Sequence, residues 1–414
     1  MLPIAFPPLL AGIRVLDASR VLAGPYCGQL LGELGADVIK IERPGQGDDT
    51  RHWGPPFHPT GPSAYFLSCN HNKRGIALDL TRPRGRELFD ALLLQSDVVL
   101  ENFLPATAER LGLSSARLLS VQPRVIVCSI SGFGHTGPLA DVPGYDFAIQ
   151  ALSGLMSITG PVGGEPSKVG VAITDVLTGL YAATAILACL IARGRTGQGY
   201  HIDLSLLDCA VAAQVNVVQA YLTRCQMGLT PSEAVPPRQG NAHLQIVPYE
   251  LLPTADGWLV LAVGNDGQWQ RLAQSIAPDL ADDARYATNA LRVRHREQLM
   301  PRLHELFRQR STQTWQELLT GIEVPHAPVW TYAEMFQHPH ALAHQLKVSV
   351  SDAQGRPVDL LGSPFRIGSR ESVPSPPLLR MPPGLGEHTA EVLSELCGLD
   401  ATEIDQLRQD RLIE

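Results

Sequence analysis

The sequence predicts an α/β protein built on an open, largely parallel sheet. Short runs rich in Val, Ile and Leu alternate with helical stretches up to about residue 224, a pattern typical of βαβ units with right-handed crossovers. The character of the chain changes near residue 225, where a stretch rich in proline and polar residues begins. At 414 residues, with 44% hydrophobic and 18% charged residues, the chain is long enough for two or three domains and a large core.

The first part of the chain supplies most of the expected elements. Residues 13–18 (IRVLDA) and 36–41 (ADVIKI) are expected to be buried strands on either side of a helix at 23–34, without the GxGxxG fingerprint of a dinucleotide site. A loop of charged residues, Gly and Pro follows over 42–57, and loops of this size are often functional. The remaining expected elements are a strand at 76–80, a helix at 84–95, strands at 97–100 and 124–130, helices at 146–156 and 176–191, a strand at 200–204 and an apolar helix to about 223.

The second part predicts a smaller region and a return segment. A linker over 227–239 leads into this region, and the stretch PHAP at 325–328 closes it. The expected elements are a strand at 257–263, helices at 266–276, 295–310 and 312–320, two short strands within 345–372 and an amphipathic helix at the end of 386–413. The predicted domains are therefore 1–224, 225–335 and 336–414.

Composition excludes several classes of protein. The net charge of −8 offers no basic footprint for nucleic acid or for anionic membranes. Seven cysteines without a CxxC pair fit a reducing compartment better than a disulfide framework or a zinc site. The N-terminus lacks a basic region and carries prolines at positions 3, 7 and 8, and the longest uncharged apolar run, 176–191, is short for a membrane span. We therefore expect a cytoplasmic protein without a nucleic-acid or membrane partner.

Asp175 stands where a glycine-punctuated loop becomes the long uncharged segment 176–191. This predicts a position at or near the N-cap of a helix, where the helix dipole and free N–H groups would keep the carboxylate ionised at neutral pH. An ionised, partly desolvated carboxylate can act as a nucleophile. The alternative is that Asp175 is only a structural N-cap, which contributes about 1 kcal/mol to stability. Most aspartates at the start of a helix have only this role.

Six basic residues fall at the ends of expected strands or in the loops after them: Arg20, Lys40, Arg43, Lys73, Arg74 and Arg110. The carboxyl ends of strands form the ligand crevice of an open α/β sheet, and basic groups there suit a polyphosphate. Each of these residues, taken alone, also fits a solvated surface charge. Asp146 is expected to cap the helix at 146–156, and His243 either contacts substrate or has an ordinary loop role.

These residues lie in segments that resemble family III of the CoA-transferases, which includes formyl-CoA transferase, carnitine CoA-transferase and the α-methylacyl-CoA racemases. The resemblance runs from about residue 10 to the C-terminus. The segments that carry it are IRVLDASRVLAGP, GADVIKIERPGQGDDTR, NHNKRGIALDL, SDVVLENF, SISGFGHTGP, GYDFAIQALSGLMSITG, GVAITDVLTGLYAA, GRTGQGYHIDLSLLD, RQGNAHLQIVPYE, LAVGNDGQW and VPHAPVWTYAEMF. Several of them are long and occur in the same order, so chance agreement is implausible.

The resemblance implies a mechanism and a set of site residues. Asp175 falls at the family's nucleophilic aspartate, which forms an aspartyl anhydride and then an aspartyl–CoA thioester. Coenzyme A enters as the thioester substrate, and no permanently bound cofactor or metal is expected. The CoA-binding residues implied by the resemblance are Arg20, Val21, Ala23, Arg43, Lys73, Asn102, Phe103 and Arg110. Arg74 is expected to join them because it belongs to the set of basic residues at strand ends described above.

The resemblance also separates branches of the family. The racemases place His before the Asp of a GHD segment, whereas this chain has Gly144-Tyr145-Asp146. Because racemisation needs groups on both faces of the α-carbon, CoA transfer is favoured, with a racemase and an acyl-CoA hydrolase as the alternatives. The glycine-only loop of formyl-CoA transferase is replaced by GNAHLQIVPYE, which disfavours formate or oxalate as substrates.

The segments GDDTRHWGPPF, GLMSITGP and AHLQIVPYE resemble the branch that transfers CoA between succinate and hydroxymethylglutarate. This implies succinyl-CoA as the donor and a dicarboxylate such as glutarate, hydroxymethylglutarate or itaconate as the acceptor. The expected substrate-binding residues are Arg51, His52, Tyr145, Gly240, Asn241 and His243. The family fold further implies an open Rossmann-like CoA-binding domain formed by N- and C-terminal segments, a smaller inserted α+β domain and an interlocked homodimer.

Overall fold

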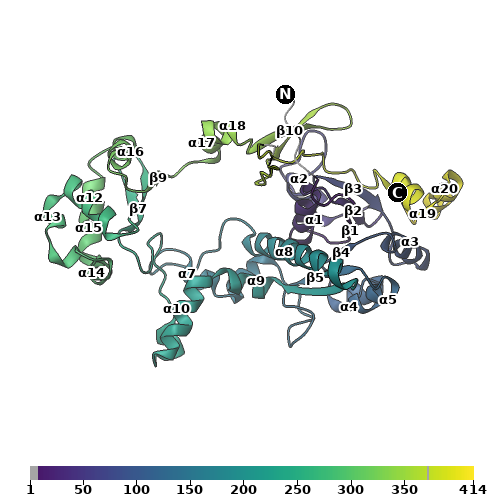
Figure 1. Ribbon diagram of the computed structural model, residues 1–414, viewed down its shortest axis with the longest axis horizontal. Helices are drawn as coiled ribbons and strands as arrows, with labels where there is room; N and C mark the ends of the chain where they lie inside the picture. Colours follow the sequence, from purple (N-terminus) through teal and green to yellow (C-terminus); the bar gives the residue numbers. More distant parts are fainter. Residues whose placement is uncertain (1–7, 371–372) are drawn as a thin grey trace. The chain divides into compact units, whose positions relative to one another are not determined.

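The computed structural model describes residues 8–370 and 373–414 (Figure 1). The chain divides into two compact units. Unit 1 comprises the residues up to 155 together with 169–215 and 339–414, and unit 2 comprises 156–168 and 216–338. The sequence therefore leaves unit 1 and returns to it, and the short segment 156–168 belongs to unit 2 although it lies within the predicted domain 1–224.

Unit 1 is built on a six-stranded sheet in the order β3-β2-β1-β4-β5-β6, and every neighbouring pair of strands is parallel. The strands are β1 (Arg14–Asp17), β2 (Asp37–Glu42), β3 (Lys73–Ala77), β4 (Val98–Glu101), β5 (Ile126–Ser131) and β6 (Tyr200–Ser205). The order 3-2-1-4-5-6 is that of doubly wound dinucleotide-binding sheets, which confirms the predicted open α/β sheet. Its topological switch point lies between β1 and β4, where the connections leave in opposite directions.

The two faces of the sheet bury alternate side chains, as a parallel sheet covered on both sides requires. Val15, Val38 and Ile126 face one hydrophobic cluster, whereas Leu16, Ile39 and Val127 face the other. The first face is covered by α1 (Ala23–Glu33), α6 (Asp146–Leu152), α8 (Ile173–Thr196) and α9 (Leu206–Ala213), and the second by α3 (Pro83–Leu93), α4 (Pro105–Leu111), α5 (Ser115–Val121), α19 (Thr389–Cys397) and α20 (Ala401–Gln409).

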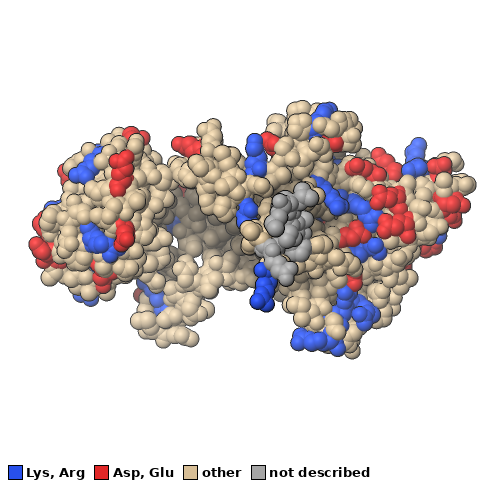
Figure 2. Space-filling view, turned by 45° about the horizontal axis from the view of Figure 1, so that its top comes forward, with Lys and Arg blue, Asp and Glu red and all other residues tan. Residues whose placement is uncertain are grey.

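The C-terminal segment completes unit 1 along the edge strand β3. The N–H of His388 donates to the carbonyl of Gly75 at 2.9 Å, and the N–H of Ala77 donates to the Thr389 hydroxyl at 3.1 Å. Figure 2 shows acidic and basic side chains intermixed at the end of unit 1 that carries α19 and α20, where Arg74 pairs with Glu391 and Glu395. The other elements of unit 1 are the 3₁₀ turn η1 (Asp49–His52), α2 (Ala64–Cys69), α18 (Pro339–Ala343) and the hairpin of β10 (Lys347–Ser351) with β11 (Pro357–Leu361).

Unit 2 contains the antiparallel sheet β7-β8-β9, made of β7 (Tyr249–Pro253), β8 (Trp258–Ala262) and β9 (His326–Pro328). Its core includes Trp269, Phe307 and Trp315, and the last two rings stack at 4.2 Å. Helices α7 (Leu155–Ile158) and α10 (Val215–Gln226) lie in unit 2 except for their first residues, which end segments of unit 1. The other helical elements of unit 2 are α11 (Pro231–Ala234), α12 (Asp266–Ile276), α13 (Pro278–Ala281), η2 (Ala284–Tyr286), α14 (Asn289–Arg294), α15 (Arg296–Phe307), α16 (Thr312–Gly321) and α17 (Tyr332–Gln337).

Three expected elements differ from the structure. The strand predicted at 76–80 begins at Lys73, because Val38 of β2 pairs with Lys73 and extends the ladder. The single helix predicted to end near residue 223 is two helices, α9 and α10, which meet at a 79° bend. The final helix is likewise two, α19 and α20, because Gly398 ends α19 in a left-handed conformation with φ of 70°.

Helix α8 is longer than the apolar run 176–191 from which it was predicted. It has 24 residues, with Asp175 in its first turn and Arg193 and Arg195 in its last, so charges favourable to the helix dipole lie at both ends. By length and composition α8 is able to cross a membrane, as is the bent pair α9–α10 if counted as one span. Core helices pass the same test, and α8 contributes Ala182 and Ile186 to the core beneath the sheet.

Candidate active site

The first turn of α8 carries Asp175. The N-cap is Ala172, so Asp175 is the third helical residue rather than the cap itself. Its side chain is half-buried, and the backbone N–H of Ala23 donates to it. Burial, reinforced by the nearby charge of Asp146, raises the pKa of Asp175 to about 7. The expectation that the helix dipole keeps this carboxylate fully ionised at neutral pH is therefore wrong, because the loss of solvent outweighs the favourable dipole and hydrogen bond.

A cavity of about 230 Å³ opens onto Asp175. The segments after β1, β4 and β5 supply its walls, so it lies at the carboxyl ends of the strands around the switch point, the place where open α/β sheets bind ligands. Seven of the expected site residues line it: Arg20, Val21, Ala23, Asn102, Phe103, Tyr145 and Asp175. The structure thus brings the expected nucleophile together with most of the expected CoA-binding residues that follow β1 and β4.

A second cavity, of about 340 Å³, adjoins the first and shares Arg20, Phe103 and Thr107 with it. Arg43 and Arg110 line it from the segment after β2 and from α4, and both side chains are exposed. Solvent-facing guanidinium groups at the carboxyl edge of a parallel sheet suit the phosphates of a nucleotide-like ligand. The cavity with the exposed arginines and the cavity with Asp175 therefore have three lining residues in common.

The turn between β1 and α1 is strained and firmly held. Val21 has φ of 71°, which is costly for a β-branched residue. The amide of Asn102 accepts from the N–H of Arg20 at 2.8 Å and donates to its carbonyl at 2.7 Å. The Asp48 carboxylate accepts from the N–H of Val21 at 3.3 Å. These contacts fix the turn that delivers the N–H of Ala23 to Asp175. Asp48 was not among the expected site residues, and its position in the charged loop 42–57 was the only signal for it.

Two buried ion pairs lie beneath this turn. Lys40 pairs with Asp48 at 3.0 Å and Lys73 with Asp17 at 2.8 Å, and all four side chains are fully buried. Burial alone would raise the pKa of Asp17, but the ammonium groups of Lys73 and Lys40 hold that pKa below its usual value. The Lys73 ammonium also donates to the Pro25 carbonyl and to the Asn70 amide. All three protons of this ammonium are donated inside the protein, which favours a structural role, and the CoA-binding role expected for Lys73 stays a prediction.

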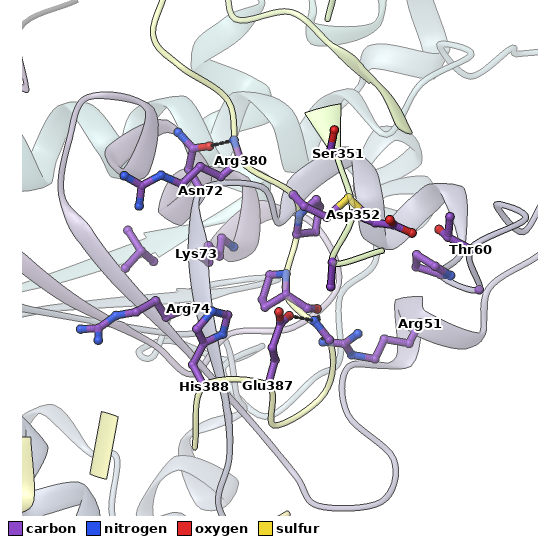
Figure 3. A pocket seen from close by; sticks show the side chains of 18 of the residues that line it. Arg51, Thr60, Asn72, Lys73, Arg74, Ser351, Asp352, Arg380, Glu387 and His388 are labelled. Atoms are coloured by element: carbon purple, nitrogen blue, oxygen red, sulfur yellow. Dashed lines mark hydrogen bonds between the residues drawn. The ribbon is translucent and has the colours of Figure 1, made fainter. Parts of the chain in front are cut away.

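Arg51 and Arg74 also have structural partners. Arg51 is bonded twice to Glu42 and its guanidinium lies 3.7 Å from the centre of the Phe66 ring. Arg74 is bonded to Asp37, Glu391 and Glu395. With His52 they line a different cavity, of about 1180 Å³, beside the edge strand β3 (Figure 3). Neither of the two cavities near Asp175 includes them, so the structure does not bring Arg51, His52 or Arg74 to the nucleophile.

The expected substrate residues of the GNAHLQ stretch lie in unit 2. Gly240 and His243 line a cavity of about 210 Å³ with Ile158, Val217 and other neighbours. The His243 ring lies 5.4 Å from that of Tyr249, and its Nδ1 accepts from the N–H of Gln245 at 3.0 Å. Asn241 is exposed within the same turn. Among the expected substrate-binding residues, Tyr145 is the one that lines the Asp175 cavity.

A doubly wound parallel sheet with a half-buried carboxylate at its switch point and exposed arginines in an adjoining cavity is typical of an α/β enzyme with a nucleotide-like substrate. The model of CoA-transferase family III matches residues 10–389. The chain belongs to that family and is a CoA-transferase.

Relatives of known name agree with this assignment. The chain is 43% identical to the succinate–glutarate CoA-transferase of Agrobacterium fabrum, with 95% of this chain and 97% of the relative aligned. It is 40% identical to the human succinyl-CoA:glutarate CoA-transferase, with 96% and 88% aligned. Among solved structures, a CAIB/BAIF family protein from Brucella suis superposes with a TM-score of 0.79 at 42% identity, covering 94% of this chain and 99% of that one.

Proposed function

We propose that the chain transfers CoA from succinyl-CoA to a dicarboxylic acid, foremost glutarate, with Asp175 as the nucleophile. The observation that carries this proposal is the position of Asp175, half-buried at the switch-point crevice and next to a cavity with exposed arginines. The names of the bacterial and human relatives support the choice of succinate and glutarate. Hydroxymethylglutarate and itaconate remain the further acceptors that the sequence resemblance implies.

The proposed reaction proceeds through two covalent states of Asp175. Its carboxylate attacks the thioester carbonyl of succinyl-CoA and expels the CoA thiolate, which leaves a succinyl–aspartyl anhydride. The thiolate then attacks the aspartyl carbonyl, releasing succinate and forming an aspartyl–CoA thioester. The acceptor carboxylate attacks this thioester to give a second anhydride and the thiolate. Attack of the thiolate on the acceptor's acyl carbonyl releases the new acyl-CoA and regenerates Asp175, so that one difficult transfer is divided into easier steps.

The residues around Asp175 have distinct proposed roles. The N–H of Ala23, which donates to the Asp175 carboxylate, is proposed to stabilise charge on the aspartyl carbonyl oxygen in the second and third attacks, which occur at that carbonyl. Arg43 and Arg110 are proposed to bind CoA phosphates, and Arg20, Val21, Asn102 and Phe103 to line the path between phosphates and thioester. Tyr145 is proposed to contact the acyl group or the acceptor. Lys73 and Arg74 are assigned to the framework of the sheet.

A transfer assay with an acceptor panel tests the proposal. Purified protein with succinyl-CoA is expected to form the CoA ester of glutarate with kcat/KM at least about tenfold above that for acetate, because a second carboxylate offers a further binding contact. Succinyl-CoA is expected to be stable when no acceptor is added. Loss of succinyl-CoA without an acceptor would support a hydrolase instead. Exchange of the α-proton of a 2-methylacyl-CoA in deuterated water, without transfer, would support a racemase.

We further propose that the protein is a homodimer, as the family resemblance implies, and that α8 contributes to the interface. Along α8 the side chains of Leu180, Tyr181 and Ile191 are 42%, 41% and 67% exposed, and helical spacing places Leu180 and Ile191 on one face, with Tyr181 about 100° around the helix from Leu180. Exposed apolar surface of this kind can mark an interaction site.

We also propose that the protein works in the cytoplasm. Its seven free thiols fit such a reducing compartment.

Replacing Leu180 and Ile191 by glutamate is expected to convert dimer to monomer while the helical circular dichroism signal is retained, because two charges would have to be buried in the interface. Light scattering after gel filtration measures the mass. Thr402→Glu on the exposed face of α20 is the matched control and is expected to remain dimeric. A wild-type chain that elutes as a monomer at micromolar concentration would refute the homodimer.

A further inference from the structure

Two polar side chains of α6 hold the segment that precedes Asp175. Asp146 Oδ1 accepts from both the N–H and the hydroxyl of Thr174 at 2.9 Å, and its Oδ2 accepts from the Gln150 amide at 2.9 Å. Gln150, which is fully buried, accepts from the N–H of Val169 at 2.8 Å and donates to the Val171 carbonyl at 3.4 Å. The residues from 169 to 174 are thereby fastened to α6 immediately before the nucleophile.

These contacts give Asp146 a role that differs from the sequence expectation. Asp146 is the first residue of α6, and the cap of that helix is Tyr145, which makes no side-chain capping bond. The N-cap of α8, Ala172, has no side-chain acceptor of its own. Asp146 therefore supplies to α8 the carboxylate that an N-cap residue normally provides. Thr174, which receives it, is fully buried and adjoins Asp175 in the first turn.

Within residues 8–370 and 373–414, several other titratable groups lie on the elements around Asp175. Tyr65 on α2 lies close enough for Asp175 to raise the pKa of its hydroxyl, and Arg20 and Tyr145 line the same cavity. From the helices packed on α8, α1 brings Tyr26 against Gly179, and α9 brings Cys209 against Thr178 and carries Asp208. Of these groups, Asp146 is the one whose charge acts on the Asp175 carboxylate in the same direction as burial.

We propose that Asp146 is a positioning residue for the nucleophile, whose carboxylate caps α8 at Thr174 and places a fixed negative charge beside Asp175. The inference rests on the proposed role of Asp175. A like charge makes the free carboxylate more basic, and therefore a stronger nucleophile once ionised. Acylation of Asp175 removes its charge and relieves the repulsion, so the fixed charge of Asp146 also favours the covalent intermediates over the free enzyme. The cap keeps the reacting carboxylate in one place through all four attacks.

Asp146→Asn is the variant that separates charge from shape, since an amide oxygen can still accept from Thr174. The pH at which transfer falls to half on the acidic side is expected to move down by about half to one pH unit, because removal of a like charge lowers the pKa of Asp175. The rate at pH 9, where Asp175 is ionised in both proteins, is expected to fall severalfold. Asp146→Glu retains the charge, so transfer is expected to fall to half at the same acidic pH as in wild type. The matched control is Asp208→Asn on α9, which is expected to leave this pH unchanged.

A second readout does not depend on catalysis. Carbon-13 NMR of protein labelled at aspartate carboxyl carbons, with Asp175→Asn to assign the resonance, measures the titration of Asp175 directly. A midpoint near neutral pH in wild type and a lower one in Asp146→Asn are expected. Equal midpoints in the two proteins, with unchanged thermal stability, would overturn the inference. A shifted midpoint in a protein that transfers CoA to no acceptor would leave the charge effect standing and would refute the proposed function instead.

Discussion

Asp175→Ala is expected to lower kcat/KM for CoA transfer by at least about 10⁴-fold, because no covalent intermediate can form without the carboxylate. Asp175 does not line the adjoining cavity that carries Arg43 and Arg110, so binding of CoA is expected to persist. The measurement is initial-rate kinetics with succinyl-CoA and glutarate, together with the dissociation constant of CoA by calorimetry.

The matched control is Asp208→Ala, which removes a first-turn carboxylate from the adjacent helix α9 and is expected to change the rate by less than about threefold. If Asp175→Ala retained more than about a tenth of wild-type activity, Asp175 would be a structural residue and another nucleophile would be required. Loss of CoA binding in the same variant would instead point to a collapsed site.

Lys73→Met is expected to destabilise the protein by about 3–5 kcal/mol, because it leaves the carboxylate of Asp17 buried without its partner at 2.8 Å. The loss is measured by urea unfolding at pH 7.5. Among molecules that remain folded, the KM for succinyl-CoA is expected to be close to that of wild type. This result would place Lys73 in the framework of the sheet rather than in the CoA site.

The control is Lys347→Met, which removes a lysine from an exposed ion pair. The side chains of Lys347 and Asp359 are 56% and 53% exposed, so this substitution is expected to lower the free energy of unfolding by less than about 1 kcal/mol. A Lys73→Met protein with wild-type stability and a KM raised more than about tenfold would show that Lys73 binds the CoA phosphates. The internal contacts of its ammonium would then have to open when CoA binds.

Several features of the fold were predictable because they depend on local chemistry. The β-branched runs at 13–18, 36–41 and 124–130 became β1, β2 and β5, since parallel strands covered on both faces must be apolar throughout. Helix α12 matches its predicted bounds of 266–276, where Asn265 provides the side-chain cap. Arg20, Asn102 and Phe103 line one cavity; the rule for strand ends pointed to Arg20, whereas Asn102 and Phe103 were expected there from the family resemblance.

Other features depend on pairings that no local pattern encodes. Lys73 lies at the first position of β3, so its ammonium reaches Asp17 on β1 instead of the solvent. Asp146 and Thr174 are separated by 28 positions and meet only because α6 and α8 pack together. The pKa of Asp175 depends on how much solvent its neighbours exclude, and a sequence of loop residues does not reveal this.

Intact-mass spectrometry of the protein mixed with succinyl-CoA tests the central role of Asp175 most directly. Wild type is expected to gain the mass of an aspartyl–CoA thioester, or of a succinyl group at an earlier time, and hydroxylamine is expected to remove either adduct and mark Asp175 in the peptide map. Asp175→Asn is expected to show neither adduct. Transfer activity in wild type without any adduct at Asp175, or an adduct at another residue, would contradict the proposed mechanism.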